Sequence, residues 1–291
     1  MSEPNPDHPA PEFVPDPEDE NFSKEPYVEE SYEPLRPVGA PLSSDPSQPP
    51  GADPSASSKD TPGVLQRPGP ALGIGCGGCA GYFLLGQIVP GILFGIYLAA
   101  SGRMNDVQAA TMESLPFLTG AAVIVAIAFV VVSRRLGWLD EGPLGPDAIW
   151  KRFAWPIAIA AACPFGAELI SLFQIHVLNL PFQEQEILVS AAKAGGIGFW
   201  LAIVVGAPLG EELFFRRWFY GITRKPLGLW LAFLASGLAF AIIHFNPTGF
   251  VAYLWIAACC TFAYERSGSV WGAVFVHFVN NSIAAAMLSQ A

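Results

Sequence analysis

From residue 71 onward the chain is a series of apolar blocks, each about as long as the ~20 residues that cross a bilayer as a helix. Backbone groups in lipid need hydrogen bonds within their own segment, and the alternation of a membrane β-barrel is absent, so the blocks are predicted to be helices. The sequence therefore predicts an all-α, polytopic membrane helical bundle. It has about seven transmembrane blocks, which run approximately over residues 77–100, 115–133, 153–173, 197–215, 227–245, 248–264 and 270–287.

The segment 1–70 differs in composition from the rest of the chain. It holds 17 of the 27 prolines, 14 acidic residues and only 4 basic ones, and so accounts for the entire net charge of −10. Such a segment cannot bury enough apolar surface to offset its ordering entropy. We predict a disordered, acidic, Pro-rich cytoplasmic tail at 1–70 and a transmembrane domain at 71–291. No apolar stretch follows a basic start, so no cleavable signal peptide is expected.

The distribution of Lys and Arg predicts the orientation of the chain in the cell membrane. Loops 134–152 and 214–226 carry four basic residues each, and Arg266 lies on the same side, whereas the opposite loops hold only Arg103 and Lys193. We therefore expect a cytoplasmic N-terminus and an external C-terminus. Residues 182–194 mix charges with aliphatic side chains, which is typical of a short interfacial helix.

The cysteines favour packing over chemistry. Cys76 and Cys79 have disulfide spacing, but they lack a second pair and open a Gly-rich membrane segment, where small residues let helices approach closely. Small-residue packing is favoured there over a redox or metal site. The other three cysteines fall in apolar blocks and are interpreted as small buried hydrophobes: Cys163, Cys259 and Cys260.

Costly polar side chains interrupt three of the apolar blocks. Glu211 and Glu212 follow a stretch, 197–210, that contains no charged residue. Ionisable groups at membrane depth cost at least ~2.5–3.5 kcal/mol each and are functional candidates by default. Two later blocks each carry a pair of residues four apart, and such residues share one helix face: Phe240 with His244, and His277 with Asn281.

The two adjacent glutamates are expected to differ in function. They point about 100° apart on a helix. Glu212 can form an i, i+4 ion pair with Arg216, which leaves Glu211 free to face a cavity. We therefore expect a chemical role for Glu211 and a structural role for Glu212 and Arg216.

These polar groups suit the attack of water on a carbonyl. Glu211 would act as the general base, and His244 would help to hold or polarise the same water. His277 and Asn281 would donate hydrogen bonds to the oxyanion, and one such donor is commonly worth ~10²–10³ in rate. A glutamate with two histidines also matches the ligands of catalytic zinc sites, although the HExxH pairing is absent.

Some polar residues have less specific interpretations. A single membrane histidine is often an interhelical hydrogen-bonding group. Glu168, in the third block, either lines a substrate groove or hydrogen-bonds between helices. Asn280 is expected to face away from Asn281 and has no assigned role, and Phe240 is expected to pack beside His244.

Glu211-Glu212-xxx-Arg216, then Phe240-xxx-His244, then His277-xxx-Asn281, in this order on successive membrane helices, resemble the CPBP family of intramembrane proteases. The family includes the type II CAAX prenyl endopeptidases and the bacterial Abi or bacteriocin-processing homologues, and the resemblance covers about residues 195–287. It implies a glutamate-type endopeptidase without a cofactor, with a zinc-dependent version as the alternative. In that endopeptidase Glu211 and His244 activate water, His277 and Asn281 form the oxyanion site, and Glu212, Arg216 and Phe240 support them.

The expected partners are the lipid bilayer and a membrane-associated peptide or protein, and no nucleic acid is expected. The substrate would be a prenylated CAAX tail, a bacteriocin-like peptide or a membrane-anchored protein. The alternatives are a non-proteolytic immunity or scaffold protein with the same fold, and a small transporter. A transporter would show internal repeats and paired broken helices, and the sequence shows no such repetition.

The depth of His244 poses a difficulty for a common site. The stretch from Pro226 to His244 is nearly as long as a transmembrane helix, so His244 would lie near the far face if the fifth helix began at the membrane boundary. We therefore predict that this helix begins well inside the cytoplasm, and that the turn at 244–247 lines a wet cavity in contact with Glu211. Irregular backbone is tolerated at membrane depth only where protein encloses it or it lines a cavity.

Overall fold

The computed structural model describes residues 64–103, 107–139, 149–181, 186–194 and 196–290. Within this part of the chain every regular element is helical, which confirms the predicted all-α class. After a short turn, η1 (Val64–Gln66), the first long segment joins α1 (Pro68–Phe83), the π-helical turn η2 (Leu84–Ile88) and α2 (Val89–Ala100). It is followed by α3 (Val107–Arg135), α4 (Ile149–His176) and the short helix α5 (Glu186–Ala194), which lies within the predicted interfacial stretch.

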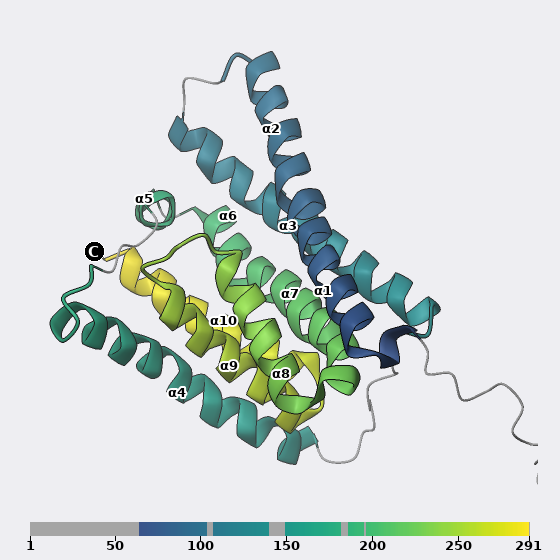
Figure 1. Cartoon of the computed structure of the whole chain (residues 1–291). Helices are drawn as coiled ribbons and strands as arrows, with labels where there is room; N and C mark the ends of the chain where they lie inside the picture. Colours follow the sequence, from purple (N-terminus) through teal and green to yellow (C-terminus); the bar gives the residue numbers. More distant parts are fainter. Residues whose placement is uncertain (1–63, 104–106, 140–148, 182–185, 195, 291) are drawn as a thin grey trace, which may run out of the picture. The chain divides into compact units, whose positions relative to one another are not determined.

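The second half of the chain carries the predicted site residues. A single helical run contains α6 (Ile197–Trp200), η3 (Leu201–Gly206), α7 (Ala207–Glu212), η4 (Leu213–Tyr220) and α8 (Gly221–Ile242), and η3 and η4 are π-helical. It is followed by α9 (Phe250–Ser267) and α10 (Val270–Leu288). Figure 1 shows α8, α9 and α10 running alongside one another.

The predicted blocks correspond to seven long helical segments when the single run is divided at the non-helical Gly228, but only five stretches of the described chain are long and apolar enough to cross a membrane. The predicted fourth and fifth blocks form one candidate span, Ile197–Ile242. The predicted sixth block, α9, is not a candidate span, and its last turn contains Glu265 and Arg266. Because α9 packs against α4, α8 and α10, protein replaces lipid around much of it, and its composition can be less apolar.

Helical structure begins before the predicted boundary at residue 70. Residues 1–63, most of the predicted disordered tail, lie outside the described residues. α1 begins at Pro68, with proline in its first turn, where a missing N–H costs no intrahelical hydrogen bond. Because the boundary at residue 70 is predicted from composition alone, the prolines that begin α1 are assigned to the tail.

Gly228 folds α8 back on itself and removes the difficulty over the depth of His244. Its backbone is non-helical, with φ 76° and ψ 174°. Beyond it the chain returns along the preceding helix, because the Ser236 hydroxyl donates to the Phe215 carbonyl at 3.0 Å. Glu211 precedes this corner by nearly the same length of chain as separates the corner from His244. The helical stretches before and after Gly228 are therefore nearly equal in length, and they place the side chains of Glu211 and His244 at the same height along the bundle.

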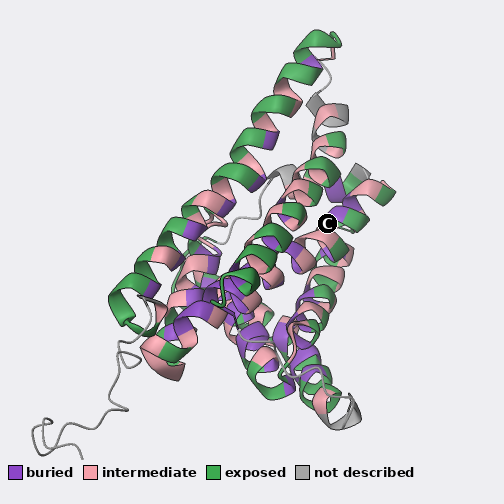
Figure 2. Cartoon of the chain, turned by 90° about the vertical axis from the view of Figure 1, so that its right-hand side faces the viewer, coloured by how far each residue is buried: buried purple, intermediate pink, exposed green. Residues whose placement is uncertain are grey.

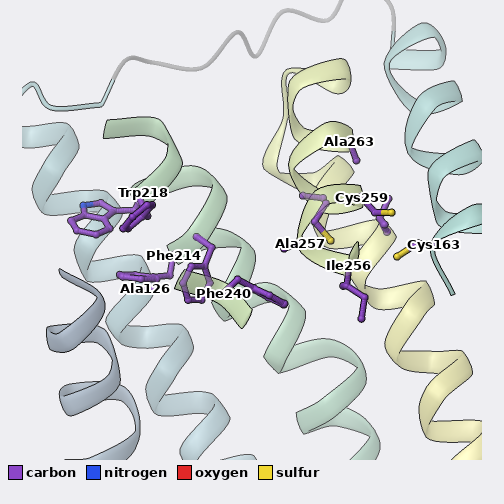
Figure 3. Close-up of a cluster of buried hydrophobic side chains, with 14 of the residues drawn as sticks. Ala126, Cys163, Phe214, Trp218, Phe240, Ile256, Ala257, Cys259 and Ala263 are labelled. Carbon is purple, nitrogen blue, oxygen red and sulfur yellow. The ribbon is translucent and has the colours of Figure 1, made fainter. Parts of the chain in front are cut away.

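Aromatic and small residues pack the helices around this corner. Buried positions concentrate where the helices meet (Figure 2), and Figure 3 shows Phe214, Trp218 and Phe240 within the main buried cluster. Large apolar side chains such as Ile96 of α2 are exposed on the outer helix faces, as expected where lipid is the solvent. The chain is a multi-pass membrane protein.

Candidate active site

The four predicted catalytic residues line one cavity of about 920 Å³. Glu211 comes from α7, His244 from the turn after α8, and His277 and Asn281 from α10. The cavity also meets α1, α3, α4 and α9, so its walls come from most of the bundle. The predicted convergence of polar groups from separate helices on one cavity is present.

The end of α8 fixes the orientation of His244. The backbone N–H of His244 donates to Ala241 O rather than to Phe240 O, which leaves the Phe240 carbonyl without its helical donor, as is usual at a helix C-terminus. The imidazole Nδ1 lies 2.8 Å from that carbonyl oxygen. Because a carbonyl only accepts, Nδ1 carries the proton, and Nε2 of the neutral ring is an acceptor.

The Nε2 atom of His244 lies 3.9 Å from Glu211 Oε2. This distance is too long for a direct hydrogen bond, and one shared water can bridge it. Glu211 Oε2 is buried and has no hydrogen-bond partner among the described groups. The two side chains therefore present two acceptors to the O–H bonds of one water, whose lone pairs are left free for attack.

Glu212 and Arg216, behind the cavity wall, form a buried cluster with His277, which lines the cavity. Glu212 Oε1 accepts from Arg216 Nη1 at 3.0 Å and lies 2.8 Å from His277 Nδ1. The predicted Glu212–Arg216 ion pair is therefore present, and both side chains are fully buried. The carboxylate holds the proton of His277 on Nδ1, so Nε2 remains available to the cavity that His277 lines.

Phe240 connects the two parts of the site. Its carbonyl accepts from His244, and its ring lies 4.6 Å from the His244 ring centroid and 5.7 Å from that of His277. The guanidinium of Arg216 lies 4.6 Å from the centre of the Phe240 ring, within the range of a cation–π contact. The expected packing of Phe240 beside His244 is observed.

A π-helical turn explains how Asn281 is held. The N–H of Ala207 donates to Ala202 O rather than to the next carbonyl along the chain, and Pro208 has no N–H. The Ile203 carbonyl therefore lacks a helical donor, and Asn281 Nδ2 donates to it at 3.0 Å. An amide nitrogen has two N–H groups, so the second one is left for the cavity.

Asn280 contradicts the expectation that it faces elsewhere. It is buried, lines the same cavity, and donates from Nδ2 to Asn281 Oδ1 at 3.3 Å. The Cys163 thiol lies 3.8 Å from its Oδ1. Adjacent residues on a helix diverge by about 100°, but the cavity spans enough of the face of α10 to include both asparagines.

Two tyrosines of the site were not predicted. Tyr253 of α9 stacks on the His244 ring at 4.2 Å between centroids. Tyr82 of α1 stacks on Phe214 at 4.0 Å, and both tyrosines line the cavity. Tyr82 follows the Gly-rich stretch of a membrane block, and Tyr253 lies in the next block after His244. Neither position has a spacing pattern that could have identified it.

The zinc alternative is not supported by the arrangement of possible ligands. Among the described residues, the one group of three possible ligands whose atoms all lie within 4.8 Å of one another is Glu212, Cys260 and His277, and it does not include the predicted base Glu211. The guanidinium of Arg216 lies 3.0 Å from Glu212 Oε1. A cation beside this carboxylate would be repelled by the guanidinium, so these residues do not fit a metal ion.

Comparisons with known proteins agree with the resemblance drawn from the motifs. Residues 193–283 match the family model described as "Type II CAAX prenyl endopeptidase Rce1-like". The Bacillus subtilis protein named "Putative membrane peptidase YdiL" is 22% identical over 175 residues, which are 60% of this chain and 69% of that protein. The Lactococcus lactis protein named "UPF0177 protein YbdI" is 35% identical over 79 residues, 27% of this chain and 42% of that protein. No solved structure matches the chain.

Proposed function

Since residues 193–283 belong to the Rce1-like family of type II CAAX prenyl endopeptidases, we propose that the chain is an intramembrane endopeptidase that uses a glutamate-activated water. One observation carries the proposal. Glu211 and His244, from separate helices, come within 3.9 Å of each other at the wall of a shared cavity. A purely structural role for either residue would not require the two side chains to lie so close together.

The reaction begins with a water held between Glu211 Oε2 and His244 Nε2. Glu211 takes a proton from the water as the new C–O bond forms at the scissile carbonyl. The carbonyl oxygen becomes an oxyanion, which accepts from the second N–H of Asn281. When the C–N bond breaks, Glu211 returns its proton to the leaving nitrogen, so water and peptide become an acid and an amine.

Glu212 orients His277 toward the oxyanion. Its carboxylate bonds to His277 Nδ1, as carboxylates orient histidines in other hydrolases. His277 Nε2 is thereby directed into the cavity that Asn281 also lines, where both residues would form the oxyanion site. Arg216 fixes the carboxylate by its bond to the same oxygen and by donating from Nη2 to Ala257 O at 3.1 Å.

The substrate we propose is a membrane-associated peptide or protein. The cavity has the volume of a small-molecule pocket, and many of its lining residues are apolar. Its apolar walls suit an extended chain that carries a lipid group, such as a prenylated tail, or an apolar bacteriocin-like segment. The alternative function is that of an immunity or scaffold protein, which would have the same fold but would not cleave peptides.

The test is a cleavage assay with full-length protein in lipid nanodiscs. Its substrates are fluorescence-quenched peptides in farnesylated and unmodified forms. Glu211→Gln removes the base but keeps the shape of the side chain, and we expect a loss of at least about 10²-fold in kcat. Glu265→Gln, which removes the same charge outside the cavity, is the matched control. Cleavage that Glu211→Gln leaves intact would refute the mechanism, and chelation followed by zinc would detect a metal-dependent version.

A further inference from the structure

The cavity wall contributed by α4 carries a charged side chain that the proposed chemistry does not use. Six residues of α4 line the cavity: Pro164, Ala167, Glu168, Ser171, Leu172 and Ile175. Their spacing of three and four residues is that of a single helix face. Glu168 is the only charged member of this face.

Glu168 lies well inside the membrane-crossing part of α4. The candidate span runs from Arg152 to His176, so at ~1.5 Å per residue Glu168 is ~24 Å from one end and ~12 Å from the other. No hydrogen bond or ion pair joins it to another described residue. Of the two interpretations of Glu168, the interhelical hydrogen bond is therefore not found among the described residues, which leaves the groove.

The carboxylates that line the cavity are not balanced by any Lys or Arg of its described lining. Its described lining contains the carboxylates of Glu168 and Glu211, together with two histidines, and neither Lys nor Arg. Arg216 does not line the cavity and is bonded to Glu212 behind the wall. A cleft that is lined by negative charges and has low-dielectric walls attracts cations and repels anions.

We propose that Glu168 binds a cationic side chain of the substrate, a Lys or Arg near the scissile bond. The inference rests on the proposed function because it takes the cavity to be the place that holds the substrate. Glu168 is an exposed residue of the cavity lining, where water can screen its charge. We therefore expect a preference of about fivefold rather than several orders of magnitude.

Binding can be measured apart from cleavage. Full-length Glu211→Gln protein in nanodiscs is titrated with fluorescent, farnesylated peptides in which one residue is Lys, norleucine or Glu. The variable residue is moved through successive positions from the lipid anchor. At one or more positions we expect the Lys peptide to bind about fivefold more tightly than the norleucine peptide, and the Glu peptide to bind most weakly.

Further substitutions in the same background identify the group responsible. Glu168→Gln is expected to abolish the difference between the Lys and norleucine peptides, and Glu168→Lys is expected to favour the Glu peptide. Glu265→Gln is the control, because Glu265 is bonded to Arg224 and Tyr220 at the end of α9 and does not line the cavity. This variant should keep the preference for Lys.

The outcomes separate this inference from the proposed function. Equal binding of the Lys and norleucine peptides at every position, no binding of any peptide, or a Lys preference that survives Glu168→Gln would each overturn the assignment of Glu168. A Lys preference that depends on Glu168, together with no cleavage by protein that retains Glu211, would instead contradict the peptidase proposal alone.

Discussion

The two neighbouring asparagines of α10 make different hydrogen bonds and should contribute differently to catalysis. Asn281 bonds to Ile203 O with one N–H, and we propose that its other N–H binds the oxyanion, whereas Asn280 donates to the Asn281 side chain. Asn281→Ala is expected to lower kcat by about 10²–10³. Asn280→Ala removes only an orienting hydrogen bond and is expected to cost about tenfold. Measurement of kcat at saturating peptide separates the two effects.

A suitable control for the asparagine variants is Ser282→Ala. The Ser282 hydroxyl is on the same helix but is exposed and bonded to Phe278 O, so kcat should not change. Equal kcat values for Asn281→Ala and the wild type would remove Asn281 from the oxyanion site. A loss in Asn280→Ala as large as that in Asn281→Ala would make Asn280 a direct donor rather than an orienting residue.

The contacts that sequence could predict are those within one helix. The four-residue spacing of Glu212 and Arg216 is sufficient for their ion pair. The bond between Glu212 and His277 joins residues 65 apart in the chain, and no local pattern specifies it. The bond from Asn281 to Ile203 depends on a carbonyl that is free only because a π-helical turn precedes Pro208.

Among the helices, the corner at Gly228 positions His244, and its geometry requires glycine. Its φ and ψ lie in a region open essentially only to glycine, where another residue costs about 1–3 kcal/mol. A Cβ at Gly228 would meet nothing within 4 Å, so Gly228→Ala tests the backbone alone. We expect a lower melting temperature in detergent and a reduced kcat, because His244 is displaced from Glu211.

Gly95→Ala is the matched control for Gly228→Ala. A Cβ added at Gly95 would also meet nothing within 4 Å, but this glycine lies inside α2 with an ordinary helical backbone. There alanine is expected to maintain or raise the melting temperature. If Gly228→Ala melted at the wild-type temperature with full activity, the corner would not depend on glycine.

The packing of α1 against the helix that carries Glu211 depends on small residues, as the sequence predicted for the Cys76–Cys79 segment. A Cβ at Gly78 would lie only 1.9 Å from the Trp218 ring, whereas at Gly77 it would meet nothing within 4 Å. Gly78→Ala is therefore expected to destabilise the protein by about 1–3 kcal/mol. Gly77→Ala should not destabilise it. The melting temperatures of the two variants are compared in the same detergent, and equal values would contradict close packing at Gly78.

Hydropathy predicted where the helices lie but not how they are interrupted. The π-helical turns η2 and η3 directly precede the segments that contain Pro90 and Pro208. A wider turn accommodates a residue that lacks an N–H. Because the average apolarity of a block is the same with or without such a turn, composition could not reveal it. The fold-back at Gly228 was hidden for the same reason.

Considered as a whole molecule, the bundle places most of its basic residues at one end. Arg224 Nε lies 3.0 Å from Glu265 Oε1, which places the Gly228 corner beside the end of α9 and Arg266. Trp218 Nε1 donates to Ser133 at 2.7 Å, which brings the end of α3, with Arg134 and Arg135, near the same corner. Arg216 does not belong with these charges, because it is fully buried in its ion pair.

This clustering leads to a prediction about orientation. Short loops rich in Lys and Arg remain in the cytoplasm, so the Gly228 end should be cytoplasmic. Seven segments that all cross would then place the C-terminus outside. A phosphatase that is active only outside the cell should be active when fused after Ala291 and silent when inserted between residues 143 and 144, between α3 and α4 in the sequence. The opposite pair of results would invert the protein in the membrane, and silence at both sites would mean that α10, which starts beside the Gly228 corner, does not cross.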